Sequence, residues 1–300
     1  MSRFAIFIFC LACSLHAYGQ DSLSSSQEPC AAAQSDNSLG IVISVADVSF
    51  WGSDIQLASS YQNEIAAMVE STAHGSSVED VTDKALELVR EAWQDHGYFR
   101  ARVTGDAKTI SSNAISQRIS LSVHVEEGFQ YRLQGITFKH NKVFYSDILR
   151  KLFPIGNGEV VERQKIAKGL ENLKRAYDNQ GFLNYTPIPA PSFDETNRLM
   201  SWEIDIDEGK QFYVRDLKVI GRDEAATQTV LGKLLLKRSD LYDENLLNLS
   251  LEQQGLKLPE CACRGMLHMD EKNGTVDIIL DFRPCDEEAS ITPSPSPLRP

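Results

Sequence analysis

The feature that most constrains the fold of this chain is a junction that its sequence contains twice. Residues 122–141, "SVHVEEGFQYRLQGITFKHN", and residues 202–222, "WEIDIDEGKQFYVRDLKVIGR", both alternate apolar and polar residues, break at a Glu-Gly pair and then alternate again. Alternation with a period of two places one side of a strand on a core and the other side in water. The two Glu-Gly pairs lie 81 residues apart, so we interpret the chain as a tandem repeat.

A third copy of the repeat follows at a shorter spacing. The segment "AYDNQGFL" (176–183) aligns with "SLEQQGLK" (250–257), and "SWEIDID" (201–207) aligns with "TVDIILD" (275–281), both at 74 residues. Relative to the 81-residue spacing, the last copy lacks seven residues, the length of about two helical turns. Its second helix is therefore expected to run only from about residue 243 to 254.

Helical patterns connect the strands. The first two copies each carry one apolar stripe at helical spacing, made of Val81, Ala85, Leu88, Val89, Ala92 and Trp93 in the first and of Ile166, Leu170, Leu173 and Tyr177 in the second. The long helices are expected to end at Gly97, Gly181 and Gly255, because glycine adopts the left-handed conformation that closes a helix. Ser146 is expected to cap a shorter helix that Pro154 ends. The repeating unit is thus strand, helix, helix, strand, strand.

The N-terminus has the composition of an export signal. Residues 1–19 contain one Arg, an apolar run too short to span a bilayer, and small residues at Ala17 and Gly19. This pattern predicts a signal peptide that is cleaved before Gln20. The alternative is lipoprotein processing before Cys13.

Two further segments lack any period. Residues 20–40 are rich in Ser, Ala and Gln and are expected to be a disordered linker, and residues 286–300 form a Pro- and Ser-rich tail. The formal net charge of −12 argues against a general nucleic-acid binder, which would present a basic surface.

The repeats resemble the POTRA (polypeptide-transport-associated) modules of BamA-type outer-membrane protein assembly factors. The segments that carry the resemblance are "VEEGFQYRLQGITFKHN", "IDEGKQFYVRDLKVIGR", "LKRAYDNQGF" and "VREAWQDHGYF". The resemblance divides the chain into module 1 at 41–127, module 2 at 128–209 and module 3 at 210–285, the last with a shortened second helix. It implies an α+β fold of three tandem βααββ modules, each a three-stranded mixed sheet with two helices on one face.

The same resemblance implies a location and partners. We expect a periplasmic protein, associated with the outer membrane, that binds outer-membrane β-barrel proteins, their assembly machinery or unfolded β-rich polypeptides. It implies no catalytic residue and no cofactor. Members of the family usually continue into a membrane β-barrel. Fewer than 20 residues follow module 3 here, so we expect no barrel in this chain.

Sheet edges are the predicted binding surface. An edge strand can add an extended chain by β-augmentation, in which backbone groups make the bonds. In the resembled family the strand after the second helix is an edge, which here means about 183–188 in module 2 and 265–269 in module 3. Pro187, Pro189 and Pro191 remove backbone donors from the edge of module 2. We therefore predict client binding at Gly265, Met266, Leu267, His268 and Met269. The alternative function is a structural adaptor in protein secretion or envelope organisation that binds no unfolded clients.

The sequence contains no catalytic constellation. It has neither G-x-S-x-G nor H-E-x-x-H nor a phosphate-binding glycine loop, so we predict that the protein is not an enzyme. Glu203, Asp205 and Asp207 lie on one side of a predicted strand at spacings of about 7 Å, too far apart to share a proton. We interpret them as a solvated sheet face rather than a metal or acid–base site.

The cysteines of module 3 are candidates for a disulfide, because an exported chain meets an oxidising compartment. The segment "KNGT" (272–275) predicts a two-residue hairpin turn, which would place Cys285 beside Cys261 and Cys263. Zinc binding by these cysteines with His268 is the weaker alternative, since the spacing fits no common zinc signature.

We predict a disulfide between Cys285 and either Cys261 or Cys263. It would close a loop of 21 or 23 intervening residues and stabilise module 3 by about 3 kcal/mol. Thiol labelling of the denatured, unreduced protein measures it, and full labelling of Cys285 without reductant would contradict it. Stoichiometric zinc in the purified protein would favour the metal alternative.

Overall fold

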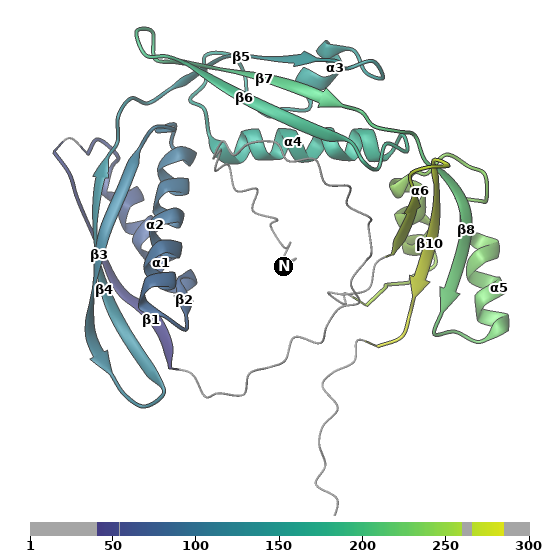
Figure 1. The fold of residues 1–300 in the computed structure, drawn as a ribbon, viewed down its shortest axis with the longest axis horizontal. Helices are drawn as coiled ribbons and strands as arrows, with labels where there is room; N and C mark the ends of the chain where they lie inside the picture. The colour runs from purple at the N-terminus through teal and green to yellow at the C-terminus, as the bar shows by residue number, and fades with distance from the viewer. Residues whose placement is uncertain (1–40, 54, 260–265, 285–300) are drawn as a thin grey trace, which may run out of the picture. The chain divides into compact units, whose positions relative to one another are not determined.

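The computed structural model describes residues 41–53, 55–259 and 266–284 (Figure 1). The expected signal peptide, linker and tail lie outside the described residues, as do Gly265 and the cysteines at 261, 263 and 285. Within the described residues the chain forms three sheets, one in each module, and each sheet is mixed. The α+β class that the sequence predicted is confirmed.

Module 1 has a four-stranded sheet in the order β2-β1-β4-β3. Strand β1 runs parallel to β4, and the other pairs are antiparallel. The prediction of three strands was therefore one short, because the segment between the helices forms the two-residue strand β2. The elements are β1 (Val42–Trp51), α1 (Ser59–Thr72), β2 (His74–Gly75), α2 (Val78–Asp95), β3 (Arg102–Ser112) and β4 (Ser116–Glu126).

Modules 2 and 3 have the predicted three-stranded mixed sheets, in the orders β5-β7-β6 and β8-β10-β9. In both sheets the first strand runs parallel to the last, and the remaining strand is antiparallel at one edge. Module 2 consists of β5 (Arg132–Lys139), α3 (Ser146–Lys151), α4 (Arg163–Asp178), β6 (Thr186–Asp194) and β7 (Leu199–Asp207). Module 3 consists of β8 (Tyr213–Ile220), α5 (Glu224–Lys233), α6 (Glu244–Gln253), β9 (Leu267–Asp270) and β10 (Thr275–Asp281).

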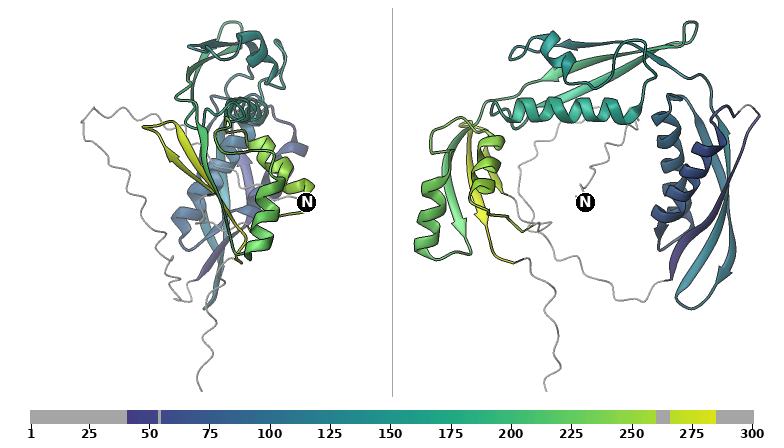
Figure 2. Two further views of the ribbon diagram at one scale, coloured as in Figure 1. Left: turned by 90° about the vertical axis from the view of Figure 1, so that its right-hand side faces the viewer. Right: turned by 180° about the vertical axis from the view of Figure 1, so that it is seen from behind.

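Each module has a core of its own between the sheet and two helices that cover one of its faces (Figure 2). The alternation of the last strands decides which residues enter it. In β4 the buried residues are Ile119, Leu121, Val123 and Val125, and in β10 they are Val276, Ile278 and Leu280. The residues between them face away from the helices, so the period-two reading of these strands is confirmed.

Two predictions about the helix ends are confirmed, the closing glycines and the short α6, and one, the cap of α3, is wrong. Gly97, Gly181 and Gly255 have positive φ angles directly after the long helices. Helix α6 has 10 residues against 16 in α4, and the side chain of Asp243 caps its first turn. The prediction that Ser146 caps α3 was wrong. Tyr145 occupies the N-cap without a side-chain bond there, and the Ser146 hydroxyl accepts from Asn141 Nδ2 instead.

The predicted two-residue turn in module 3 was also wrong. Thr275 pairs with Asp270, so the hairpin loop has four residues, 271–274. The Asp270 carboxylate accepts from the backbone and side-chain nitrogens of Asn273. The loop after β6 has the same construction, with Asp194 accepting from Asn197. The similar segments "DETN" (194–197) and "DEKN" (270–273) were the sequence signal for this loop. The four-residue loop shifts the strand pairing by two residues from the one used to align Cys285 with Cys261 and Cys263.

A close contact in module 2 depends on a missing side chain. A Cβ atom at Gly169 on α4 would lie 2.0 Å from Cδ1 of Phe153, whose ring packs in the core. Glycine therefore stands here in a helix interior, where it usually lowers stability, because the Phe153 ring occupies the space of a methyl group. Gly232 on α5 offers a matched contrast, since a Cβ there would meet nothing within 4 Å.

Gly169→Ala should destabilise module 2 by about 1–2 kcal/mol, because overpacking outweighs the gain in helix propensity. Gly232→Ala should instead stabilise module 3 by about 0.5–1 kcal/mol. Amide hydrogen exchange of Ile204 and of Ile278 reports the two modules separately. Equal effects of the two substitutions would show that the Phe153 contact is unimportant.

Candidate binding site: a glutamate clasp and an open sheet edge

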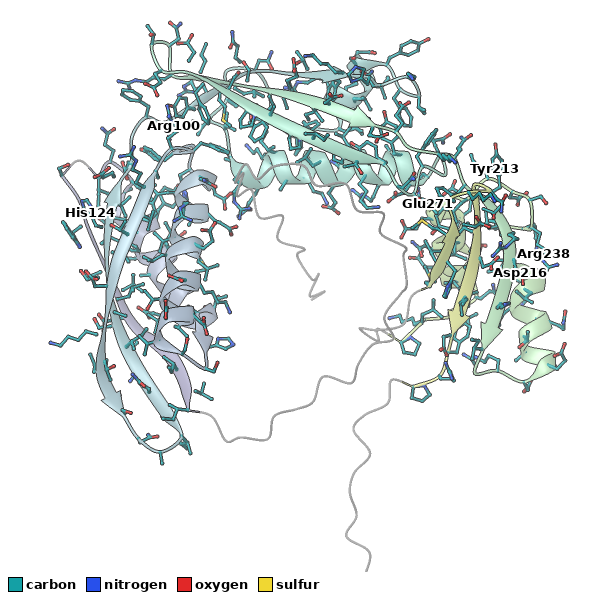
Figure 3. All side chains as sticks on the ribbon, in the orientation of Figure 1. Arg100, His124, Tyr213, Asp216, Arg238 and Glu271 are labelled. Carbon is teal, nitrogen blue, oxygen red and sulfur yellow. The ribbon has the colours of Figure 1, made fainter. Side chains whose placement is uncertain are left out.

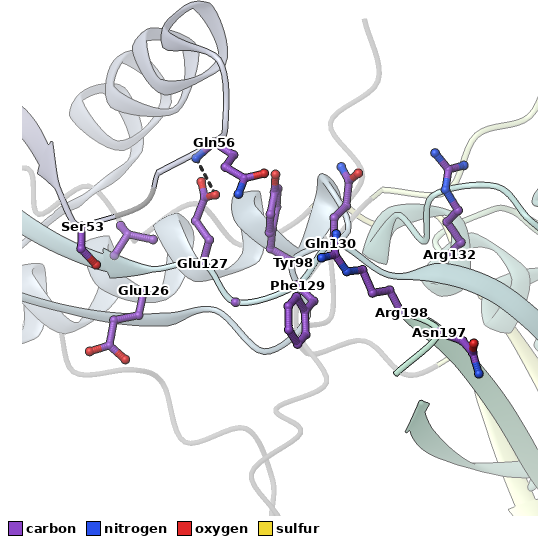
Figure 4. Close-up of a pocket in the computed structure, with 12 residues that line it drawn as sticks. Ser53, Gln56, Tyr98, Glu126, Glu127, Phe129, Gln130, Arg132, Asn197 and Arg198 are labelled. Carbon is purple, nitrogen blue, oxygen red and sulfur yellow. Dashed lines mark hydrogen bonds between the residues drawn. The ribbon is translucent and has the colours of Figure 1, made fainter. Parts of the chain in front are cut away.

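The glutamate of the first Glu-Gly junction is a buried structural group. Glu127 is 5% exposed, and its carboxylate accepts three hydrogen bonds. Gln56 N donates at 2.7 Å (Figure 4), Leu57 N at 3.0 Å and the Trp93 indole Nε1 at 2.8 Å. The carboxylate thus joins the loop before α1, the end of α2 and the end of β4. We call this arrangement the glutamate clasp of module 1.

Module 2 repeats the glutamate clasp with Glu208. Its Oε1 accepts from Lys142 N at 2.7 Å, Val143 N at 2.8 Å and the Tyr177 hydroxyl at 3.1 Å. Tyr177 stands four residues before the helix-ending glycine, as Trp93 does in module 1. Burial, followed by the hydrogen bond to Glu208, raises the pKa of the Tyr177 hydroxyl well above its ordinary range. An aromatic donor on the second helix is therefore part of the motif.

Module 3 replaces both partners of the clasp with apolar residues. At the 74-residue offset, Phe282 stands in the place of Glu208 and Leu251 in the place of Tyr177. Both side chains belong to the core of module 3. A buried carboxylate without donors would be costly, so the loss of the donor and of the acceptor go together. The Glu-Gly junction that the sequence emphasises thus stabilises the fold, and each of its carboxylates accepts three hydrogen bonds from its own module.

The three modules close one edge of their sheets in the same way. In module 2, Leu133 N donates to Glu159 O at 2.8 Å and Gly158 N donates to Leu133 O at 2.7 Å. In module 3, Val214 makes the equivalent pair of bonds with residues 239–240 at 2.8 and 2.7 Å. In module 1 the corresponding segment is regular enough to form β2. The fourth strand of module 1 is therefore the regular form of a loop that all three modules share.

The opposite edge of each sheet is open. Strands β3, β6 and β9 each pair with one neighbour only in the part of the chain that the structure describes. The predicted residues Leu267, His268 and Met269 lie on β9, and Met266 directly precedes it. Gly265 lies outside the described residues. The sequence did not single out β3, which is an open edge of 11 residues without proline.

Hydrogen-bond parity decides which residues of β9 face the open edge. Ile279 N donates to Met266 O at 2.8 Å, so Met266 and Ile279 form a hydrogen-bonded pair. Because such pairs alternate along an antiparallel ladder, Leu267 and Met269 direct their backbone N–H and C=O groups away from β10. In β6 the same outward positions are held by Pro187, Pro189 and Pro191, which have no N–H to offer.

Met269 adds an apolar contact point beside this edge. It pairs with Val276, which is fully buried, so the two side chains project from the same side of the sheet. Met269 is nevertheless 48% exposed. The second helix of module 3 has 10 residues, against 16 in module 2.

On the outward faces of the sheets, acidic side chains contact side chains of the neighbouring strands or of the residues next to them. In module 2, Lys139 Nζ lies 2.7 Å from Glu203, and the hydrogen bond from His140 lowers the pKa of Asp205. In module 3, Arg215 binds Asp277 and lowers the pKa of that carboxyl.

A second arginine of module 3, Arg238, pairs with Asp216 at the edge that the loop closes (Figure 3). No group of three His, Cys, Asp or Glu side chains suited to a metal ion occurs among the described residues. The carboxylates therefore have the surroundings of a solvated, ion-paired face.

Comparison with known proteins agrees with this geometry. Residues 131–209 match the POTRA family model, described as a surface antigen variable number repeat. The whole array resembles the POTRA part of BamA-type assembly factors. It superposes on the crystal structure of Haemophilus influenzae BamA POTRA3-5 with a TM-score of 0.60 and 19% identity, over 81% of this chain and 96% of that one. At this identity the similarity establishes the fold.

Curated relatives share the sequence pattern over part of their length. The chain is 26% identical over 165 residues to an outer membrane protein assembly factor of Treponema pallidum (strain Nichols), covering 54% of this chain and 20% of that protein. It is 23% identical over 168 residues to the outer membrane protein assembly factor BamA of Neisseria meningitidis serogroup B, covering 56% and 21%. The chain thus spans about a fifth of the length of these relatives. None of the described helices has the length and apolarity needed to cross a bilayer.

Glu127→Gln should destabilise module 1 by about 2 kcal/mol, because the amide replaces one acceptor of charge-assisted bonds with a donor. Its exposed neighbour Glu126 is the matched control, and Glu126→Gln should change stability by less than about 0.5 kcal/mol. Amide exchange of Val89 and Val123 measures both effects. Equal exchange in the two variants would mean that the glutamate clasp adds nothing to stability.

Proposed function

We propose that this protein is a non-enzymatic, periplasmic binding protein for outer-membrane protein biogenesis, and that it holds extended client strands at the open edge of β9. The observation that carries the proposal is the combination of outward backbone groups at Leu267 and Met269 with the half-exposed Met269 side chain. A client strand that pairs with this edge gains backbone hydrogen bonds and an apolar contact together. Backbone bonding tolerates many client sequences, which suits unfolded β-rich polypeptides.

The comparison of the three open edges supports β9. At the outward positions of β6, Pro187, Pro189 and Pro191 have no backbone N–H to donate, so that edge resists strand addition. Strand β3 is longer, yet it carries Arg102, Asp106 and Lys108, and charged residues on an edge oppose pairing with another strand. Strand β9 has neither feature between Leu267 and Met269.

The location and partners are inferred from the resemblance. POTRA modules belong to outer-membrane assembly factors, so we infer residence in the periplasm, association with the outer membrane, and binding to assembly machinery or to β-barrel precursors. A passive adaptor that separates two envelope proteins is the competing function, and it requires no open edge.

Met269→Pro should abolish binding of an unfolded β-rich client peptide, because the substitution removes one outward N–H and leaves the ladder to β10 intact. Leu267→Pro should do the same, with an added loss of core packing. Met269→Leu is the matched control, because it keeps both the backbone donor and an apolar side chain, and it should bind the peptide like the unmodified protein.

Fluorescence anisotropy of a labelled porin-strand peptide measures binding, and amide exchange should show new protection at residues 266–269 when the peptide is present. Binding that survives both prolines excludes strand addition at β9. Protection confined to β3 would move the site to module 1, and absence of any client binding would favour the adaptor function.

A further inference from the structure

Exposed aliphatic residues lie at the tip of module 1, a different module from the one that carries the edge proposed above. They are the residues that we call the hairpin tip: Ile41, Val42, Ile110 and Ile115, with exposed fractions of 39%, 55%, 51% and 66%. Single exposed apolar residues are ordinary on protein surfaces, whereas contiguous ones mark contact sites.

The backbone places Val42 beside Ile115 although the two are far apart in sequence, and Ile110 lies on the other strand of the same hairpin. Val42 pairs with Ser116, and Val42 N donates to Ile115 O at 3.0 Å. Ile110 lies in the irregularity between Thr109 and Ser111, on the strand that faces β4. Figure 1 shows the loop between β3 and β4 projecting past β2 and past the neighbouring ends of α1 and α2. The hairpin tip therefore stands at the extremity of its module.

Side-chain hydrogen bonds close the turn at the tip. Asn113 Oδ1 accepts from Ile115 N at 3.0 Å, from Ser116 N at 2.8 Å and from the Ser116 hydroxyl at 3.2 Å. Gln117 Nε2 donates to the Thr109 hydroxyl at 2.8 Å and joins the two strands below the loop. The turn is thus closed by its own side chains, and Ile115 projects from it.

The charged residues nearest the loop are cations, and the next acidic residue on β3, Asp106, lies two residues beyond Lys108. Residues 107–125 and 41–46 contain no Asp or Glu, although the chain as a whole carries a net charge of −12. Lys108 and Arg118 flank the loop on β3 and β4, both are exposed, and neither forms an ion pair within the described residues. Asp47, an acidic residue on β1, is engaged by the Ser120 hydroxyl at 2.8 Å. The loop between β3 and β4 is thus uncharged and aliphatic, and Lys108 and Arg118 lie on either side of it.

We propose that the hairpin tip inserts shallowly into an anionic phospholipid surface. The four aliphatic side chains would enter the boundary between headgroups and acyl chains, while Lys108 and Arg118 extend their charged ends to lipid phosphates. The serine, threonine and asparagine side chains between them suit the polar headgroup layer. This would orient module 1 against a membrane and is independent of the client edge on β9.

A lipid surface fits the hairpin tip better than a protein partner does. Stable protein interfaces bury about 800 Å² on each side and need shape complementarity, and four side chains on a loop supply far less. A bilayer needs no complementary shape, and the two cations match its anionic lipids in charge.

Vesicle co-sedimentation of the full chain tests the proposal. Vesicles of phosphatidylethanolamine and phosphatidylglycerol should retain the protein at least about tenfold better than phosphatidylcholine vesicles, since each basic residue near an anionic surface contributes roughly fivefold. Ile110→Ser with Ile115→Ser should lower partitioning by at least about tenfold, because the apolar contribution is lost. Lys108→Gln with Arg118→Gln should remove the preference for the anionic lipid.

The matched control is Ile148→Ser with Ile188→Ser in module 2, whose isoleucines are 42% and 58% exposed. It should bind vesicles like the unmodified protein. Thermal melts of all variants exclude unfolding as the cause. The proposal is overturned if the protein shows no preference for anionic vesicles, or if the control loses binding as the tip variant does. It is also overturned if light scattering shows that the tip variant changes the oligomeric state while vesicle binding stays the same.

Discussion

The folds of modules 1 and 2 each depend on a carboxylate, buried in module 1 and half-buried in module 2, whose hydrogen bonds all come from its own module. Glu127 and Glu208 each bind two backbone N–H groups of the loop that begins the helical layer and one aromatic donor at the end of the second helix. Burial of the Glu127 carboxylate is tolerated because three donors compensate it, and Glu208 accepts the equivalent three bonds. The clasp therefore sets where the helices lie over the sheet, and the glycine that follows it, with φ of 71° or 66°, turns the chain into the next module.

Fixing the helical layer also decides which sheet edge is closed. The loop between the two helices reaches the first strand in every module, as β2 in module 1 and as residues 158–161 and 239–242 in the others. The edge on the far side remains open in each sheet that the structure describes. Natural proteins usually protect such edges with proline or charge. Module 2 has the prolines and module 1 has the charges, so the least protected edge lies in module 3, where the clasp has also been replaced by apolar contacts.

The two proposed surfaces place different chemistry at separate parts of the chain. The edge of β9 offers backbone groups to an extended polypeptide, and the hairpin tip of module 1 offers aliphatic side chains and cations to a lipid surface. Neither uses the conspicuous carboxylates on the outward faces, because Glu203 and Asp277 are paired with cations of the neighbouring strands and Asp205 is hydrogen-bonded to His140. The motifs that stand out in the sequence thus stabilise the modules, and the candidate binding groups are backbone atoms and ordinary aliphatic residues.

The sequence by itself determined the strands, the long helices and the repeat, because alternation at β4, β7 and β10 and the stripes of α2 and α4 are local patterns with a fixed period. It also predicted that α6 is short, because the third copy of the repeat lacks seven residues relative to the 81-residue spacing. Only the tertiary structure decided that Glu127 meets Trp93, that Ser146 caps nothing, and that Leu267 and Met269 face outward. Hydrogen-bond parity, loop closure and burial arise between residues far apart in the chain, and no local period encodes them.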